Sequence, residues 1–310
     1  MRPARAVSVV VCAYTQRRWN TLLDAVASVG RQTQPALETI VVIDHDSDLL
    51  ERAASTLRDA RVIESAGKRG LSGARNTGVT VARGEIVAFL DDDAIADDTW
   101  LEELVCGYDD PHVIGTGGVA RPRWEGGGAP RWLPQEFYWT IGCSYRGLPT
   151  DAAPIRNPIG ANMSFRKAVF DRTGGFTSGI GRVGATPLGC EETDLSIRAR
   201  QAHPGGVVLH VPAARVEHAV PAERLSWAYF RSRCWAEGLS KALVTEEVGS
   251  ADALSSEWTY TLRTLPTGVL RGLLDVVHGD LTGLRRSGTI VAGLIVTVAG
   301  YVRGRMVRTR

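Results

Sequence analysis

The first 120 residues alternate short apolar runs with stretches in which apolar residues recur at helical spacing. The runs are VSVVVCAY, ETIVVID, RVIES and EIVAFL. A helix is predicted between the first two, where Trp19, Leu22 and Val26 share one face, and another is predicted from Ser72. Short apolar runs that alternate with helices are typical of parallel strands covered on both faces. The pattern predicts an α/β fold with a mostly parallel, Rossmann-like central sheet flanked by helices.

The pattern changes near residue 121, where RPRWEGGGAPRWLPQEFYWTIGCSYRGLP has no sustained period. Its aromatic residues are too many for a disordered linker, so ordered irregular structure around a site is expected. Further along, the sequence predicts a helix around Arg166 to Arg172, a helix starting at Glu191, strands near GVVLHV and RVEHAV, and a long helix from Glu223.

Composition and charge narrow the class of protein. A chain of 310 residues with 44% hydrophobic composition can bury a large core, and a net charge of +2 gives no overall reason to expect nucleic acid. The five cysteines are scattered and form no CxxC pair, which argues against a disulfide framework and a zinc site. The apolar run near the N-terminus reads as a strand rather than a signal peptide, so a cytoplasmic protein is expected.

The C-terminal segment differs in character from the rest of the chain. Residues 263–310 hold eight arginines against Asp275 and Asp280, a net charge of +6, which leaves −4 for residues 1–262. Within it, Ser287 to Val302 is an uncharged stretch of 16 residues, shorter than the roughly 20 that span a bilayer. Two hypotheses remain open: contact with the inner face of the cell membrane, or docking on the protein core or on a second copy of the chain.

Three consecutive aspartates follow the apolar run EIVAFL. Asp91, Asp92 and Asp93 would emerge at the carboxyl end of a buried strand, where open α/β sheets bind ligands. Two carboxylates about 4 Å apart repel by roughly 4 kcal/mol at an effective dielectric of about 20, so the cluster favours a cation. Oxygen ligands suit Mg²⁺ or Mn²⁺. The alternative is a solvated acidic loop that caps a helix beginning near Thr99.

Polar residues also follow the other strands. Asp44 ends the second apolar run, near the exit of the first at Ala13, Tyr14 and Thr15. Its carboxylate could accept a hydrogen bond from a nucleotide base or simply form a turn. Arg75 lies near a helix start in GKRGLSGARNTGV, a place that favours an anion. That segment matches neither GxGxxG nor GxxxxGK[ST], which disfavours a Rossmann dehydrogenase and a P-loop ATPase.

Acidic residues and a histidine occur later in the chain. Glu191 and Glu192 open a predicted helix, where they either complement the helix dipole or act as a general base. His218 ends the strand RVEHAV. An isolated histidine is usually structural, but next to the aspartates a neutral imidazole would be a third metal ligand.

Taken together, the sequence resembles a family 2 glycosyltransferase of the GT-A fold. The resemblance covers about residues 7–240 and rests on six segments in the family's order: VSVVVCAYTQRRWNTLLDAVASVGRQT, ETIVVIDHDSD, LSGARNTGVTVARGEIVAFLDDDA, GANMSFRKAVFDRTGGF, GCEETDLSIR and VEHAV. It implies a single inverting displacement that moves a sugar from a UDP-, GDP- or dTDP-sugar to a hydroxyl acceptor, with Mg²⁺ or Mn²⁺. The acceptor would be a glycan, a lipid-linked molecule or a small molecule.

The resemblance also implies roles for individual residues. The donor would be bound by Ala13, Tyr14, Thr15, Asp44, Arg75, Asp91 and Asp92. The aspartates stand at the family's DxD motif, with Asp93 as the principal metal ligand, Asp91 as its partner and His218 completing the site. The family's base is the Asp of a Glu-Asp pair. This chain has Glu191-Glu192 instead, so Glu192 is the first candidate for the base and Glu191 the second.

The acceptor side and the domain boundaries are expected from the resemblance together with the change of pattern along the chain. Asn162 and Met163 in GANMSF resemble a loop beside the donor sugar and the acceptor. Trp132 is placed on the acceptor side, where it either stacks against a sugar ring or packs in the protein. We expect a catalytic domain over 1–245, with a nucleotide-binding half over about 1–120 and an acceptor-side half over 121–245. A helical, basic tail over 246–310 would follow.

Two other functions compete with glycosyl transfer. A nucleotidyltransferase on a related sheet would also use a carboxylate-held Mg²⁺, but it would release pyrophosphate. Against it, CAYTQRR after the first strand contains no glycine for a triphosphate loop. A non-catalytic adaptor that binds a membrane or a partner through the basic tail is the third hypothesis, and it would bind no nucleotide sugar.

Overall fold

The computed structural model describes residues 5–181, 189–249 and 258–308. The chain divides into two compact units. Unit 1 comprises Met1–Arg121, Pro149–Thr186 and Glu191–His218, and unit 2 comprises Pro122–Leu148, Pro187–Cys190 and Ala219–Arg310. These units do not divide the chain at residue 245, because the long helix before that point is part of unit 2. The catalytic domain expected over 1–245 is defined by its motifs and stays a prediction.

Unit 1 is built around a mixed sheet whose first half is parallel. Nine strands are hydrogen-bonded among the described residues, in the order β3-β2-β1-β4-β8-β6-β9-β5, with β7 paired to β9. The parallel strands are β1 (Val7–Ala13), β2 (Glu38–Ile43), β3 (Arg61–Glu64) and β4 (Ile86–Asp91). The others are β5 (Ala94–Ala96), β6 (Val113–Trp124), β7 (Ala153–Ile155), β8 (Asn162–Arg166) and β9 (Val207–Val220). The α/β fold class is confirmed, and the antiparallel half makes the sheet mixed rather than mostly parallel.

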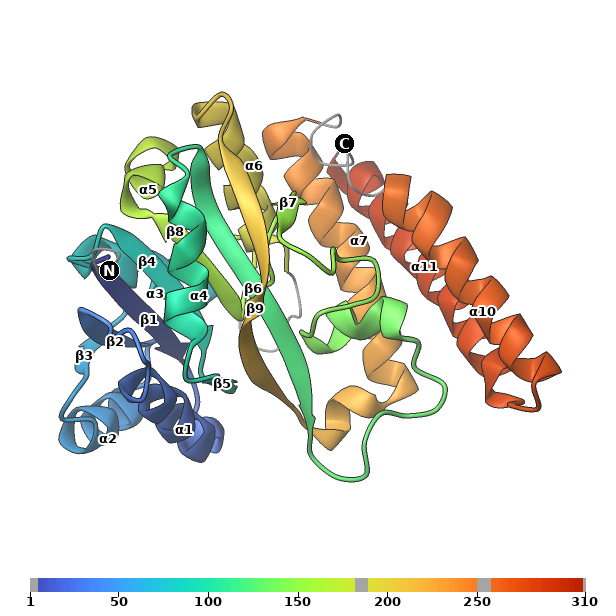
Figure 1. Cartoon of the computed structure of the whole chain (residues 1–310), viewed down its shortest axis with the longest axis horizontal. Coiled ribbons are helices and arrows are strands. Elements are labelled where there is room, and N and C mark those ends of the chain that lie inside the picture. Colours follow the sequence, from blue (N-terminus) through green and yellow to red (C-terminus); the bar gives the residue numbers. More distant parts are fainter. Residues whose placement is uncertain (1–4, 182–188, 250–257, 309–310) are drawn as a thin grey trace. The chain divides into compact units, whose positions relative to one another are not determined.

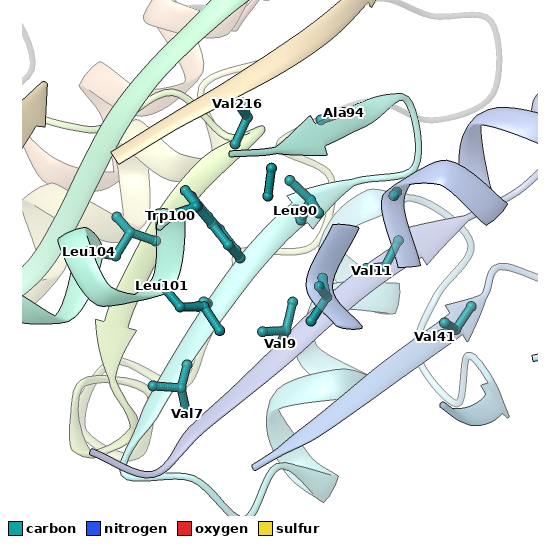
Figure 2. Close-up of a cluster of buried hydrophobic side chains, with 14 of the residues drawn as sticks. Val7, Val9, Val11, Val41, Leu90, Ala94, Trp100, Leu101, Leu104 and Val216 are labelled. Carbon is teal, nitrogen blue, oxygen red and sulfur yellow. The ribbon is translucent and has the colours of Figure 1, made fainter. Parts of the chain in front are cut away.

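Helices cover both faces of this sheet (Figure 1). One apolar core lies under α1 (Trp19–Gly30), α2 (Ser47–Thr56) and α4 (Trp100–Cys106). The other lies under α3 (Leu71–Val81), α5 (Lys167–Thr173) and α6 (Glu191–Ala202). Along β1, Val7, Val9 and Val11 face the first core while Val10 faces the second, which explains the uninterrupted apolar run. Figure 2 shows the first core, with Trp100 beside Leu90.

Three local predictions differ from the structure, and one strand was not predicted. GVVLHV and RVEHAV form the single strand β9, because β7 pairs with its first part and β5 with its last. The segment GANMSF, expected as a loop, continues into strand β8 from Asn162. Strand β6 was not predicted from the sequence, because its residues show no clear alternation of apolar and polar side chains. The long helix α7 spans Trp227–Val248 rather than starting at Glu223, because the Ser226 side chain caps it by accepting from the Tyr229 N–H.

Unit 2 consists mainly of helices. Besides α7 it contains η3 (Gln135–Ile141), η4 (Ala222–Leu225), η5 (Tyr260–Thr264), α10 (Leu265–Val277) and α11 (Thr282–Arg308). Its core includes Phe137, Phe230, Leu265 and Ile290. Close contact between α7 and α11 depends on Gly238, where a Cβ would lie 2.1 Å from the Thr297 carbonyl oxygen. The tail is therefore helical, as expected, and packs within its own unit.

One helix among the described residues, over Thr282–Val307, is long and apolar enough to cross a membrane by length and composition. Its most apolar window of 18 residues has a mean hydropathy of 1.5, and 17% of that window is buried. The same helix packs along one side against α7 and α10. The helix therefore docks on its own unit along one side, while apolar residues such as Ile295 and Val298 stay exposed.

Candidate active site

The parallel strands bring three predicted site segments to one edge of the sheet. In the β1–β4 register Cys12 pairs with Asp91, and in the β1–β2 register Ala13 pairs with Ile43. The residues that follow, Tyr14 and Asp44, therefore emerge beside Asp91. Tyr14 is 41% exposed and available to a ligand, whereas Ala13 is buried.

Thr15 and Asp44 already have partners that shape this edge. The Thr15 hydroxyl accepts from the Arg17 N–H at 3.3 Å and so starts the short helix η1 (Gln16–Arg18). Asp44 Oδ2 accepts from the Gly70 N–H at 2.9 Å, and Oδ1 lies 2.8 Å from His45 Nδ1. Asp44 thus connects the carboxyl end of β2 to the start of α3 through this hydrogen bond. Donor binding by these residues stays a prediction.

The acidic cluster and His218 meet across the antiparallel pairing of β5 with β9. Ala94 lies opposite His218 in that register, which puts the imidazole next to Asp93. His218 Nε2 is 3.3 Å from Asp93 Oδ1. One ligand atom from each of Asp91, Asp93 and His218 lies within 4.8 Å of the others. The structure therefore brings together the three residues that the sequence analysis named as metal ligands.

Arg18 is a member of this cluster that the sequence analysis did not identify. Its Nη1 donates to Asp92 Oδ1 at 2.7 Å and lies 3.1 Å from Asp93 Oδ2. Both carboxylates are almost completely buried. Burial raises the pKa of Asp92 to about 7, with Asp93 and Asp91 adding to the shift and Arg18 opposing it. The only signal in the sequence was the pair of arginines in TQRR after the first strand.

Arg75 joins the aspartates to the acidic helix. Its guanidinium is buried and donates to Glu191 Oε1 at 3.0 Å, to Asp91 Oδ1 at 3.3 Å and to the Gly160 carbonyl oxygen at 3.0 Å. Burial works against the charged guanidinium, but Glu191 and Asp91 outweigh it and raise the pKa of Arg75. Contact between Arg75 and a nucleotide stays a prediction, and the structure gives this residue a cross-linking role that its sequence context did not reveal.

The acidic residues of α6 differ in their surroundings. Glu191 is 6% exposed and bound to Arg75, and its other carboxylate oxygen is buried and has no hydrogen-bond partner among the described residues. Asp194 is fully buried and accepts from Thr177 and Arg198. Glu192 is only partly buried. Of the two candidate bases, Glu192 is the one more accessible to an acceptor.

The predicted acceptor-side residues are packed in the protein. Asn162 is fully buried, accepts from Trp100 Nε1 at 2.7 Å and donates to the carbonyl oxygens of Val119 and Ala214. Met163 is fully buried in the second core of unit 1. Their roles toward an acceptor stay predictions, now with a structural role beside them.

Trp132 belongs to unit 2 and packs edge-on against Trp227 and Phe230, with ring centroids 5.4 and 5.7 Å apart. Its packing partners support the second of the two readings left open for this aromatic residue. Among the described residues the five cysteines form no disulfide; Cys143, Cys190 and Cys234 are buried, whereas Cys106 is exposed.

The donor set fits a divalent cation. Two carboxylates and one imidazole, within reach of a common centre, are ligands that suit Mn²⁺, and the imidazole makes the set less typical of Mg²⁺. In the part of the chain that the structure describes, Asp92 Oδ2 is buried and has no hydrogen-bond partner, so this edge holds a carboxylate oxygen that a cation or ligand could pair.

The fold and the acidic edge define a class of α/β enzymes, and comparison with known proteins narrows it. The family described as glycosyl transferase family 2 matches residues 8–174. The glucosyl-dolichyl phosphate glucuronosyltransferase of Haloferax volcanii is 34% identical over 244 residues, which is 77% of each chain. The chain belongs to glycosyltransferase family 2. It is therefore an enzyme that transfers a sugar from a nucleotide-sugar donor.

Solved structures agree on the fold. A mannosyltransferase from Pyrobaculum calidifontis, in complex with GDP-Man and Mn²⁺, superposes with a TM-score of 0.62 over 96% of this chain and 88% of its own, at 18% identity. GalNAc-T7 with UDP, GalNAc and Mn²⁺ gives a TM-score of 0.56 at 19% identity and covers 84% of this chain and 55% of its own. At this identity the likeness supports the GT-A fold alone.

Proposed function

We propose that this protein is a metal-dependent, inverting glycosyltransferase that moves a sugar from a UDP-, GDP- or dTDP-sugar to a hydroxyl group of the acceptor. In an inverting transfer the acceptor oxygen forms a bond to the anomeric carbon as the bond from that carbon to the nucleoside diphosphate breaks. The hydroxyl proton goes to a base on the protein. The nucleoside diphosphate leaves from the opposite side of the sugar.

The observation that carries the proposal is the link made by Arg75 between Asp91 and Glu191. One buried guanidinium thereby binds both Asp91, a candidate metal ligand, and the first turn of α6. Glu192 follows Glu191 in that turn, which supports a base close to the acidic edge, as a single displacement at the anomeric carbon requires.

Glu192 is the proposed base, because it stands at the base position implied by the family resemblance and is more exposed than Glu191, which is bound to Arg75. Its carboxylate would take the proton of the acceptor hydroxyl. Asp91, Asp93 and His218 would hold Mn²⁺ or Mg²⁺, which when bound supplies positive charge beside the departing diphosphate. Tyr14 is exposed at the same edge and is the proposed contact for the base or ribose.

The acceptor we propose to test first is a lipid-linked sugar phosphate. The support is the relative from Haloferax volcanii, whose name states a glucosyl-dolichyl phosphate substrate. Glycans and small molecules remain alternatives, and the donor nucleotide is to be found by testing UDP-, GDP- and dTDP-sugars in turn. UDP- and GDP-sugars are tested first among these donors, because one solved neighbour was obtained with UDP and the other with GDP-Man.

We also propose that the outward faces of α10 and α11 rest on the inner leaflet of the cell membrane. Many large apolar side chains are exposed there: Leu270, Leu273, Leu274, Val277, Leu284, Val291, Ile295, Val298 and Val302. In addition, α11 contains arginines but no acidic residue. Apolar side chains flanked by arginines match the boundary of an anionic membrane better than a second copy of the same basic surface.

Turnover with purified protein tests the proposed reaction. Incubation with a nucleotide sugar, acceptor and Mn²⁺ is expected to release nucleoside diphosphate and to invert the anomeric configuration of the sugar, and EDTA is expected to abolish release. Pyrophosphate as the product would instead indicate a nucleotidyltransferase. A retained configuration would refute the inverting mechanism, and full activity in EDTA would refute the metal role.

A further inference from the structure

Unit 2 contains a cavity of about 310 Å³ that the proposed transfer reaction does not use. It lies between the segment around η3 and the helices α10 and α11. Four arginines line it, together with two acidic residues: Arg131, Arg146, Arg271, Arg286, Glu136 and Asp275. We refer to it as the arginine cavity.

Glu136 fixes two of the arginines. Its side chain is 3% exposed, accepts from Arg271 Nη1 at 2.6 Å and lies 3.7 Å from Arg146 Nη1. A Cβ at Gly268 would lie 2.8 Å from Glu136 Oε1, so the absence of a side chain there lets α10 approach the carboxylate. Arg146 and Arg271 themselves are 41% and 42% exposed. Both guanidinium groups therefore retain donors that a ligand can reach.

Arg286 is positioned in a similar way from α11. It donates to Asp275 at 2.6 Å and to Asp280, just outside the lining, at 2.8 Å. Asp280 in turn is held by Thr282, whose hydroxyl donates to it at 2.6 Å. The orientation of the Arg286 guanidinium is thus fixed before any ligand binds.

Arg131 completes the set and differs from the other three. Its backbone carbonyl oxygen accepts from Arg286, but within the described part of the chain its guanidinium makes no hydrogen bond or ion pair. Every donor of that group remains available. An exposed arginine is ordinary by itself, but this one adds to a cavity wall that already holds three positioned guanidinium groups.

The charges of the lining do not cancel. Four arginines face two acids, which leaves an excess of two positive charges, or one if Asp280 is also counted. Arginine forks match the oxygen geometry of a phosphate, and a phosphate offers more acceptor oxygens and charge than a carboxylate. The volume admits a phosphate group with part of the molecule that carries it.

We propose that the arginine cavity is a binding site for a phosphate group, distinct from the donor site in unit 1. It goes beyond the proposed transfer reaction, since no residue of the cavity takes part in it. The phosphate group could belong to either of two kinds of molecule: the headgroup of a phosphate-bearing lipid, or a free phosphorylated solute.

The test measures binding to the full chain without nucleotide sugar or divalent metal. Inorganic phosphate is titrated by calorimetry at low ionic strength, and binding to phosphatidylcholine vesicles with and without phosphatidic acid is measured by flotation. Arg131→Ala is the first variant, because removing an unpaired side chain leaves the fold intact. Arg231→Ala is the matched control, since it removes one exposed arginine of the same unit, on α7, outside both the cavity and the proposed membrane-facing helices.

Arg131→Ala is expected to weaken phosphate binding by about tenfold, as the loss of charged hydrogen bonds predicts. Arg231→Ala is expected to change it little. A lipid source predicts that Arg131→Ala selectively weakens binding to phosphatidic acid vesicles, and a solute source predicts an effect on inorganic phosphate alone. Either result supports the site. Equal effects of the two variants on both probes, or no binding of either probe by the unmodified protein, would overturn it.

Discussion

Arg75 Nη1 donates a hydrogen bond to Glu191 Oε1 at 3.0 Å, inside a part of unit 1 where both side chains are almost fully buried. The same guanidinium reaches Asp91 at 3.3 Å. Two carboxylates from segments a hundred residues apart thus share one cation. Glu191 therefore has a structural role in the site, which differs from the role proposed for Glu192.

Substitutions in the Glu191-Glu192 pair are expected to have different effects. Glu192→Gln removes the proposed base and should lower kcat by about 10²- to 10⁴-fold with little change in stability. Glu192→Asp, which restores the usual residue of the family, should retain much of the activity. Glu191→Gln weakens the buried pair with Arg75 and should cost about 1–3 kcal/mol of unfolding free energy. Steady-state kinetics and urea denaturation distinguish the two, and near-normal turnover of Glu192→Gln would refute the base assignment.

Asp93→Asn is expected to weaken Mn²⁺ binding by at least about tenfold, because it removes one of the charged ligands. Titration followed by Mn²⁺ electron paramagnetic resonance measures this without any turnover. The matched control is Asp98→Asn, whose side chain is 68% exposed and which lies outside the cluster. If Asp93→Asn and Asp98→Asn bind Mn²⁺ equally well, the acidic cluster is not the metal site.

Arg18→Gln tests the balance of charge in the metal-free protein. Without the Arg18 guanidinium, the buried carboxylates of Asp92 and Asp93 lose the cation that lies beside both of them. The free energy of unfolding of the metal-free variant should therefore be lower by about 1–3 kcal/mol. Mn²⁺ should restore more stability to the variant than to the unmodified protein, because a cation replaces the missing charge. Thermal unfolding with and without Mn²⁺ measures the difference. An equal response of both proteins to Mn²⁺ would contradict this reading of Arg18.

Membrane contact through α10 and α11 predicts that the paired change Leu270→Glu and Leu274→Glu abolishes flotation with anionic vesicles. Both leucines are exposed on one face of α10, so the fold should tolerate the change. Leu37→Glu, at an equally exposed leucine of unit 1, is the control and should float normally. If the unmodified protein instead sediments as a dimer and the double variant as a monomer, with vesicle binding unchanged, the face is an interface between two copies.

The sequence by itself determined the features that depend on local patterns. Apolar runs of β1, β2 and β4 are unbroken because helices cover both faces of these strands, and parallel strands end at one edge. The alternation of runs therefore predicted both the α/β fold and the position of Asp91 to Asp93. The motifs, in their order along the chain, predicted the family, which the comparisons confirmed.

Only the tertiary structure decided which distant side chains meet. His218 lies next to Asp93 because β5 pairs with β9 in one antiparallel register, and a shift of one residue would turn the imidazole to the other face. The partners of Arg18 and Arg75, like the four arginines that line the arginine cavity, come from segments that no local period connects. Periodicity reports which face of an element is buried, whereas the neighbour across that face is set by register and packing over the whole unit.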